Sequence, residues 1–284
     1  MKTDFSRLSI AVVGSVNLDI VATVKDFPQP GETVTNAIIN RHPGGKGSNQ
    51  ALAAHRLGAK VFMVACVGND GVAEEALSNL KAEGINLDYC RSLENISTGL
   101  ALILVSEDGE NQIVVAPGAN AAFTPDLLRL PEADAIIAQL EVPMATILQV
   151  AQNHKGYFCL NAAPAKEVAR EVLEHTDLLI VNEIEAKAIG DNLGSFKGIL
   201  ATTLGSKGAV LSRSGKQMAR ALPPKIEAVD TTGAGDAFTA ALTICLVSGM
   251  DPQPALEFAC RAGAFTATRA GAQGSPTMQE LESF

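Results

Sequence analysis

The chain of 284 residues is poor in aromatic side chains, with no tryptophan and only two tyrosines. Proteins that bind single-stranded nucleic acid stack the bases on aromatic side chains, and this sequence offers little material for such a platform. The formal net charge of −9 also argues against the clustered lysines and arginines that a phosphate backbone requires. We therefore expect no nucleic-acid partner, although a single nucleotide needs only a few local donors.

Long apolar runs are absent as well. None approaches the ~18 residues of a membrane span, and the apolar stretch near the N-terminus stops at Gly14, too early for a secretory signal. The cysteines are odd in number, form no Cys-x-x-Cys pair and mostly lie inside apolar runs, as Cys66, Cys90, Cys159, Cys245 and Cys260. This usage is typical of reduced core thiols. We expect a cytoplasmic protein with no membrane partner.

The four histidines show no ligand spacing, which predicts no metal site built by the protein alone. Short apolar runs, many of them rich in β-branched residues, alternate with helical segments along most of the chain. We expect strands at residues 9–16, 60–67, 133–139, 157–160, 177–181, 199–203 and 209–212. We expect helices at residues 44–57 and 72–83, after each of the three middle strands, and at 234–248 and 253–267. The alternation predicts an α/β fold with a mostly parallel sheet covered by helices on both faces.

Two pairs of segments depart from this alternation of strands and helices. Residues 18–24 and 33–40 flank a turn with Pro28, Pro30 and Gly31, and residues 98–105 and 112–116 read as a hairpin. We expect these segments to form a small β-lid, built mainly from residues 18–40 and 98–116. The lid would project from a single domain that spans residues 1–284.

The most informative segment is residues 230–236, Asp-Thr-Thr-Gly-Ala-Gly-Asp, which precedes an apolar helix. The small residues Gly233, Ala234 and Gly235 permit a sharp turn, and the first amides of a helix attract anions. Asp236 would be unfavourable beside an anion unless it acts as a base. A base next to amides that hold phosphate is what phosphoryl transfer to a hydroxyl requires. The structural alternative is a glycine-rich loop with an N-cap aspartate.

Polar side chains follow several of the predicted strands, where ligands bind in open α/β sheets. They are Asn17, Asp19, Glu141, Asn161, Asn182, Glu185, Thr203 and Gly205. Asn17 and Asp19 are two residues apart, so on an extended segment both face one side and suit adjacent sugar hydroxyls. Each also has a structural reading: Asn17 and Asp19 as a solvated strand end, and Asn182 with Glu185 as a capping box.

A second glycine-rich loop, residues 42–49, contains Gly45, Lys46 and Asn49. It lacks the P-loop pattern, and no G-x-G-x-x-G follows the first strand, which argues against a dinucleotide enzyme. Its glycines would let backbone amides approach a small ligand, with Lys46 and Asn49 contacting hydroxyls or phosphate. The turn at residues 203–208 either connects two strands or lines a nucleotide site.

Residues 44–71 and 230–242, with shorter motifs between them, resemble the signatures of the ribokinase-like (PfkB) carbohydrate kinase family. The resemblance covers nearly the whole chain. It implies a three-layer α/β/α sandwich with a β-lid, and transfer of the ATP γ-phosphoryl to a sugar hydroxyl, with D-ribose the expected acceptor. It also implies a homodimer formed through the lid.

The resemblance further implies a role for each matching residue. Asp236 would be the base, and Gly233, Ala234 and Gly235 the anion hole. The sugar would bind Asn17, Asp19, Gly45, Lys46, Asn49 and Glu141. ATP would contact Asn182, Thr203, Gly205 and Gly208, while Glu185 would act on Mg²⁺ through water. A monovalent cation, K⁺, would bind Asp230 and Ser275 with backbone oxygens of Thr232, Thr266, Arg269 and Gly271.

One departure from the family pattern lies in residues 186–202, which are shorter than usual, so we expect that a helix is missing there. We expect an exposed apolar patch there, or a compensating subunit contact. Other readings also stay open. They are a kinase for deoxyribose, a hexose or a nucleoside, a non-catalytic sensor on the same fold, and a dehydrogenase.

Overall fold

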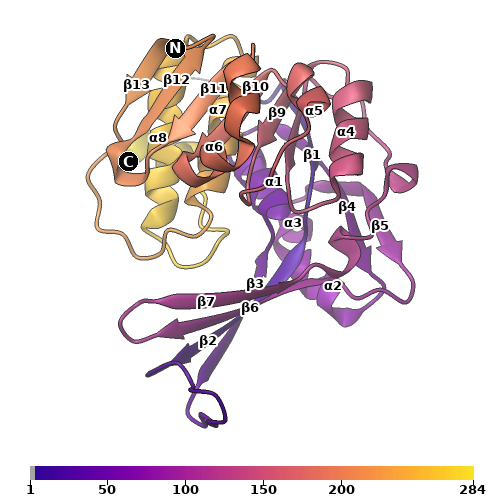
Figure 1. The fold of residues 1–284 in the computed structure, drawn as a ribbon, viewed down its shortest axis with the longest axis vertical. Coiled ribbons are helices and arrows are strands. Elements are labelled where there is room, and N and C mark those ends of the chain that lie inside the picture. The colour runs from indigo at the N-terminus through magenta and orange to yellow at the C-terminus, as the bar shows by residue number, and fades with distance from the viewer. Residues whose placement is uncertain (1–3) are drawn as a thin grey trace.

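The computed structural model describes residues 4–284 and is built around a nine-stranded sheet (Figure 1). The strand order is β13-β12-β11-β10-β9-β8-β1-β4-β5. Only the pairings β11–β12 and β12–β13 are antiparallel. The strands are β1 Ser9–Val13, β4 Lys60–Gly68, β5 Asn86–Leu93, β8 Ala135–Gln139, β9 Tyr157–Asn161, β10 Leu178–Asn182, β11 Ile199–Thr203, β12 Ala209–Arg213 and β13 Lys216–Ala221.

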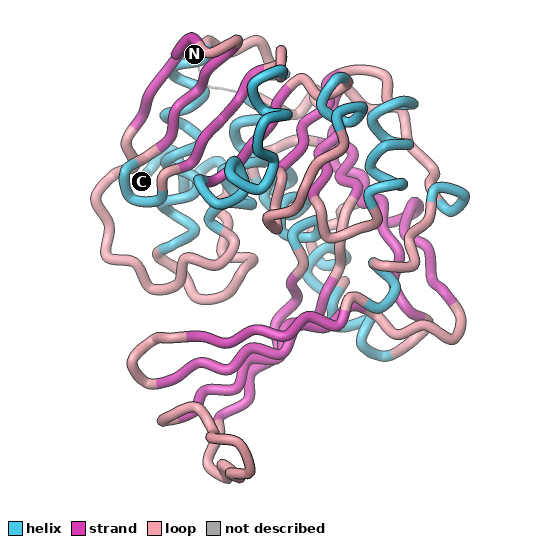
Figure 2. The backbone as a smooth tube through the Cα atoms, in the orientation of Figure 1, coloured by secondary structure: helices cyan, strands magenta, loops and turns pink. Residues whose placement is uncertain are grey.

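Helices cover both faces of this sheet, so the expected three-layer α/β/α sandwich is confirmed (Figure 2). Because strand side chains alternate, Ile10 and Val12 of β1 join one core and Ala11 and Val13 the other. The first core includes α1 Lys46–Arg56, α2 Gly71–Ala76, α3 Ser78–Ala82, α7 Ala234–Val247, α8 Pro252–Ala267 and α9 Met278–Ser283. The second includes α4 Met144–Asn153, α5 Arg170–Glu174 and α6 Glu183–Ile189. Within the described residues, every helix is too short or too polar to cross a bilayer.

A separate four-stranded sheet projects from the body (Figure 1). Its order is β3-β2-β6-β7, with β2 Asn17–Val24, β3 Ile38–Gly44, β6 Gly99–Ser106 and β7 Asn111–Ala116. We call this sheet the lid. Our placement of its second strand at residues 33–40 was wrong. The turn with Pro28, Pro30 and Gly31 extends through residue 37, and β3 runs directly into the glycine-rich loop before α1.

Hydrogen bonds fasten the lid to the body where its strands begin. Asp70 accepts from the backbone N–H of Thr98 at 2.8 Å and from its hydroxyl at 2.7 Å, just before β6. Asn120, which is buried, donates to the Asn17 side chain at 2.7 Å and exchanges hydrogen bonds with the backbone of Val16. The start of β2 is therefore held in place by a residue about 100 positions away.

The strands β5 and β13 and the helix α9 were not predicted, and the single helix predicted over residues 72–83 is two helices, α2 and α3. The expected exposed apolar patch within residues 186–202 is also absent. Ile189 and Phe196 are buried there and pack in the second core, since a 3₁₀ segment, Gly190–Ser195, folds back over the sheet. A short irregular segment thus covers this part of the sheet in place of a helix.

Candidate active site

The predicted site residues gather at the carboxyl ends of the parallel strands, beside the lid. Gln139, Asn161, Asn182 and Thr203 are the last residues of β8, β9, β10 and β11. The N-termini of α1 and α7 meet at the same edge, because Asn49 of α1 contacts Asp236 of α7. Segments from most of the chain therefore contribute to one place.

Asp236 lies in the first turn of α7 and is only 5% exposed. Its Oδ2 accepts from the Asn49 side chain at 3.0 Å, and its Oδ1 accepts from the Gln50 side chain at 2.8 Å. Burial raises the pKa of Asp236, while Lys46 and these two amides oppose the rise. A buried carboxyl whose pKa is perturbed by burial, by a nearby cation and by hydrogen-bond donors is typical of catalytic sites.

The turn before α7 depends on Gly233, whose φ of 78° is the left-handed region that favours glycine. A Cβ there would lie 2.0 Å from the Ala272 carbonyl oxygen. The Ala234 N–H donates to the Thr231 carbonyl at 3.2 Å, and the first helical bond runs from the Ala237 N–H to the Gly233 carbonyl. Among the described residues, the amides of Gly233, Gly235 and Asp236 have no hydrogen-bond partner and are available to an anion, whereas the predicted donor Ala234 is already bonded. Asp236 N–H was not among our predicted donors.

On the lid side of Asp236, Lys46 lies among four carboxylates. Asp236 raises the pKa of Lys46 against the effect of burial, and Glu141, Glu185 and Asp19 raise it further. Glu141 is fixed by the Ser15 hydroxyl and by the Lys46 backbone N–H, which donates at 3.1 Å. With all groups ionised, one ammonium group among four carboxylates gives the site a net negative charge. Such a site binds a polyphosphate only together with cations.

Asp19 of β2 belongs to the same cluster. Burial, reinforced by the charges of Glu141 and Asp236, raises the pKa of Asp19 to about 6. A partly desolvated carboxylate of this kind gains from accepting hydroxyl hydrogens. Asn49 adds a second acceptor, because its side-chain oxygen is buried and has no hydrogen-bond partner among the described residues. Gly45 lies at the N-cap of α1, next to these groups.

On the other side of the α7 N-terminus is a cavity of about 670 Å³. It is lined by Thr203, Gly205 and Gly208, as predicted, and by Ala234 and Gly235. Ser206, from the same predicted turn, also lines it, and residues that we did not predict complete it: Pro223, Pro224, Lys225, Ile226, Ala228, Thr231, Phe238, Cys260, Gly263, Ala264 and Ala267. Its mostly apolar wall suits a purine base. The spacing of Cys260, Gly263, Ala264 and Ala267 places small residues on one face of α8, a signal that was present in the sequence.

Asn182 and Glu185 form the capping box of α6, the structural alternative considered above. Both Glu185 carboxylate oxygens accept from Asn182, one from its backbone and one from its side chain. Asn182 does not line the cavity. Within residues 4–284, no group of three or more His, Cys, Asp or Glu side chains is arranged to hold a metal. The donor set therefore fits a magnesium ion only if nucleotide oxygens and water supply most ligands, with Glu185 at the edge.

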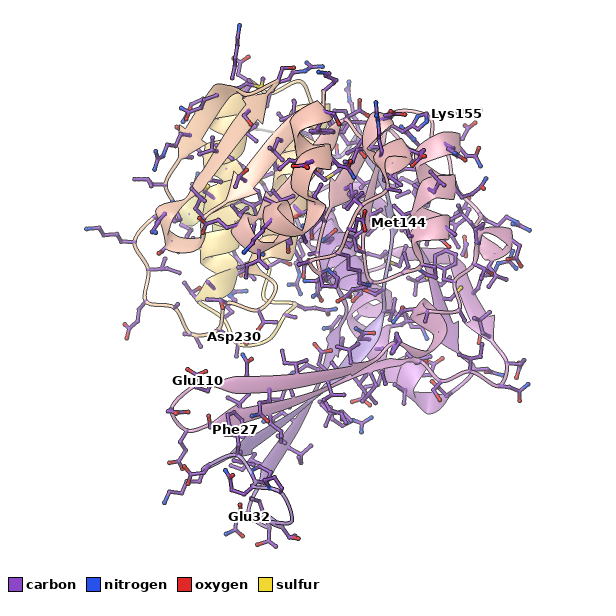
Figure 3. All side chains as sticks on the ribbon, in the orientation of Figure 1. Phe27, Glu32, Glu110, Met144, Lys155 and Asp230 are labelled. Carbon is purple, nitrogen blue, oxygen red and sulfur yellow. The ribbon has the colours of Figure 1, made fainter. Side chains whose placement is uncertain are left out.

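Asp230 lies at the edge of the body that faces the lid (Figure 3). It joins the loop before α7 to the loop after α8. Its oxygens accept from the backbone N–H groups of Thr232 and Gly271, each at 2.9 Å. Although burial opposes it, these bonds lower the pKa of Asp230, so the group is ionised at neutral pH. Near the contact between Asp230 and Gly271, the carbonyl oxygens of Gly271 and Thr266 both lie 3.5 Å from the position that a Cβ on Gly274 would take. Carboxylate and carbonyl oxygens are the ligands that hard cations prefer. Ser275 is less free than the others, because the Arg56 guanidinium contacts its carbonyl oxygen at 2.9 Å and its hydroxyl at 3.3 Å.

Residues 7–278 match the pfkB family of carbohydrate kinases. The chain belongs to the pfkB family. A ribokinase of Bacillus subtilis is 39% identical to this pfkB protein over 96% of the chain and 98% of its own length. A ribokinase structure from Thermotoga maritima superposes with a TM-score of 0.90 at 34% identity, covering 97% of this chain and 98% of its own. The structure of Arabidopsis thaliana ribokinase with ribose and ATP superposes with a TM-score of 0.86 at 29% identity, covering 97% and 98%.

Proposed function

We propose that this protein transfers the γ-phosphoryl group of ATP to O5 of D-ribose and forms D-ribose 5-phosphate. The observation that carries the proposal is the position of Asp236. It lies at a helix N-terminus between a polar cluster under the lid and an apolar cavity suited to a purine. Similarity to ribokinases over nearly the full length, one of them with ribose and ATP bound, supports the same pair of substrates.

In the proposed reaction, Asp236 takes the proton of the 5-hydroxyl as O5 attacks the γ-phosphorus, and ADP leaves. The free amides of Gly235 and Asp236 stabilise charge on the transferring group. Lys46 is placed to neutralise part of the same charge, since it interacts with Asp236 and with Glu185. Asn17, Asp19, Asn49 and Glu141 hold the sugar, and the lid excludes water that would otherwise hydrolyse ATP.

Two cations complete the proposed site. Glu185 would be the carboxylate that holds a magnesium ion through water, and the ion would supply charge neutralisation at the nucleotide phosphates. A monovalent cation at Asp230 would strengthen the field at the α7 N-terminus, because the same loop leads into the Gly233 turn. The acidic balance of the cluster around Lys46 is consistent with a need for both ions.

We also propose that two copies associate through the lid. Strand register places Ile20, Leu102 and Val114 on the face opposite Asp19, and Ile39 lies on the same side. We call these four residues the outer lid face. Ile39, Leu102 and Val114 are 56%, 48% and 66% exposed. An apolar sheet face of this kind is unfavourable in water and is well suited to a second copy of itself.

The test is turnover by the Asp236→Asn variant in an assay that couples ADP release to absorbance. We expect rates ~10²–10⁴-fold lower, with ribose and ATP binding retained. Asp251→Asn is the matched control, because Asp251 is an exposed aspartate at the start of α8. Near-normal turnover by Asp236→Asn would refute the assignment of the base.

The acceptor is tested with a panel of ribose, 2-deoxyribose, fructose and adenosine, each with and without K⁺. Asn17 is 4% exposed and would lose its partner if the acceptor lacked a 2-hydroxyl, so we expect ribose to give the highest kcat/KM. Higher kcat/KM for deoxyribose or a nucleoside would reassign the substrate. Ligand binding without any turnover would instead indicate a sensor.

A further inference from the structure

A chain of buried amide side chains leads away from Asp236 into the body of the protein. Gln50 of α1 donates from Nε2 to Asp236 Oδ1 at 2.8 Å and to the Asn161 side-chain oxygen at 3.0 Å. Gln139, the last residue of β8, donates from its Nε2 to Gln50 Oε1 at 2.6 Å. Gln50 and Gln139 are both fully buried. No role suggested by the sequence motifs accounts for this chain.

The contacts of Gln50 permit only one orientation of its amide group. In the observed orientation the NH₂ group faces two oxygens and the carbonyl oxygen faces an NH₂ group. A flip would place the Gln50 oxygen against the Asp236 carboxylate and would bring two NH₂ groups together. Buried polar groups without partners are costly, so the flipped form is strongly disfavoured. Gln139 therefore acts together with Asp236 and Asn161 to select the end of Gln50 that faces the carboxylate.

Gln139 is itself held by close packing against Gly14. A Cβ on Gly14 would lie 1.9 Å from Gln139 Oε1 and 2.9 Å from the Gly47 Cα atom. The Oε1 atom has no hydrogen-bond partner among the described residues. A buried acceptor without a partner is rare in proteins, and it is usually retained where it serves a purpose. Here the purpose is consistent with presenting the Gln139 NH₂ group to Gln50.

We propose that Gln50 and Gln139 are positioning residues for phosphoryl transfer, which together keep the Asp236 carboxylate ionised and aimed at the acceptor hydroxyl. The proposal rests on the role of Asp236 as the base. Both residues are fully buried and Gln50 contacts Asp236 directly, so their effect reaches the reaction through Asp236.

The expected direction of the shift in the pH profile follows from the charge of Asp236. Asp236 acts only when ionised, and a hydrogen bond from Gln50 stabilises the ionised form against the effect of burial. Removal of that donor raises the pKa of Asp236 and moves the acidic limb of kcat/KM to higher pH. A hydrogen bond to a charged group corresponds to a shift of about one to two pH units. The charged groups that face Asp236 in wild type and variant alike are Lys46, Glu141, Asp19 and Glu185.

The experiment compares pH profiles of kcat/KM for ribose in wild type, Gln50→Met and Gln139→Met. For Gln50→Met we expect kcat/KM at acidic pH to fall roughly 10- to 100-fold. The loss should become smaller as pH rises, and KM for ATP should stay unchanged. Gln139→Met should shift the limb in the same direction by less, because Gln50 keeps its donor but loses its orientation. If Gln50→Met does not fold, Gln139→Met alone decides the outcome.

Thr146→Val is the matched control. It removes a buried hydrogen bond to the Phe123 carbonyl, which is not part of the hydrogen-bond chain through Gln139, Gln50 and Asp236, and should leave the limb in place. An unshifted limb in the glutamine variants, or a loss that is equal at all pH values, would overturn the positioning role. Activity in Asp236→Asn would instead overturn the underlying assignment of the base, so the two failures are distinguishable.

Discussion

Replacing Asp19 by asparagine should stabilise the ligand-free protein while weakening its use of sugar. The carboxylate lies beside Glu141 and Asp236, and burial together with their charges raises the pKa of Asp19 from 3.8 to about 6. A carboxyl group with a raised pKa contributes stability below its unfolded pKa and loses it as pH rises through the folded pKa. At neutral pH the wild-type protein has lost this contribution, whereas asparagine never ionises.

The size of the effect follows from the two pKa values. A shift from 3.8 to about 6 corresponds to about 3 kcal/mol at pH 7 and to roughly half of that at pH 5. In a protein of 284 residues, each kcal/mol raises Tm by about 2–4 °C. We therefore expect Asp19→Asn to melt several degrees higher than wild type at pH 7, with a smaller difference at pH 5.

The assay is thermal unfolding without ligands, followed by circular dichroism between pH 4.5 and 8. Asp26→Asn is the control, because it removes the same charge from an exposed position on the lid. We expect the control to leave Tm nearly unchanged. A Tm for Asp19→Asn that equals the wild-type value at pH 8, or a gain that does not shrink toward pH 5, would contradict the reasoning.

Three further predictions concern the lid, the cavity and the cation loop. Val114→Asp, on the outer lid face, should halve the mass measured by light scattering, whereas Val115→Asp, on the opposite face, should leave it unchanged. Gly263→Val places methyl groups in the cavity, where a Cβ already approaches the Ala234 carbonyl oxygen at 3.0 Å. It should raise KM for ATP on the order of tenfold and leave KM for ribose unchanged. Asp230→Asn should remove any rate gain from K⁺, measured as the rate ratio between potassium and tetramethylammonium buffers.

The parallel core could be predicted because its signals are local. Runs such as residues 60–67 are apolar and β-branched, and they recur between helical segments. β13, Lys216–Ala221, was missed because its side chains are mostly polar or small, as is usual for a strand at the edge of a sheet. β3 was misplaced because the sequence does not show where a turn with two prolines ends.

The candidate site likewise contains residues that the sequence predicts and residues that it does not. Asp236, Lys46 and Asp19 were predicted because their motifs are short and contiguous. Gln50 was missed because its importance depends on Gln139 and Asn161, which lie about 90 and 110 positions away. Contacts between buried amides leave no periodic pattern in a sequence. The arrangement appears only when the strands are placed side by side.

The lid has no hinge separate from the residues that would recognise the sugar. Three residues connect β1 to β2, and Asn17 and Asp19 are among the first residues of β2. At the other end, β3 passes into α1 through Gly45, directly before Lys46. Any tilt of the lid therefore changes how Asp19 on β2 faces the proposed sugar ligands of the body, Lys46, Asn49 and Glu141. Sugar binding and lid closure are therefore coupled. An acceptor that fits poorly against Asn17 and Asp19 at the start of β2 also leaves the lid incompletely closed and the reaction exposed to water.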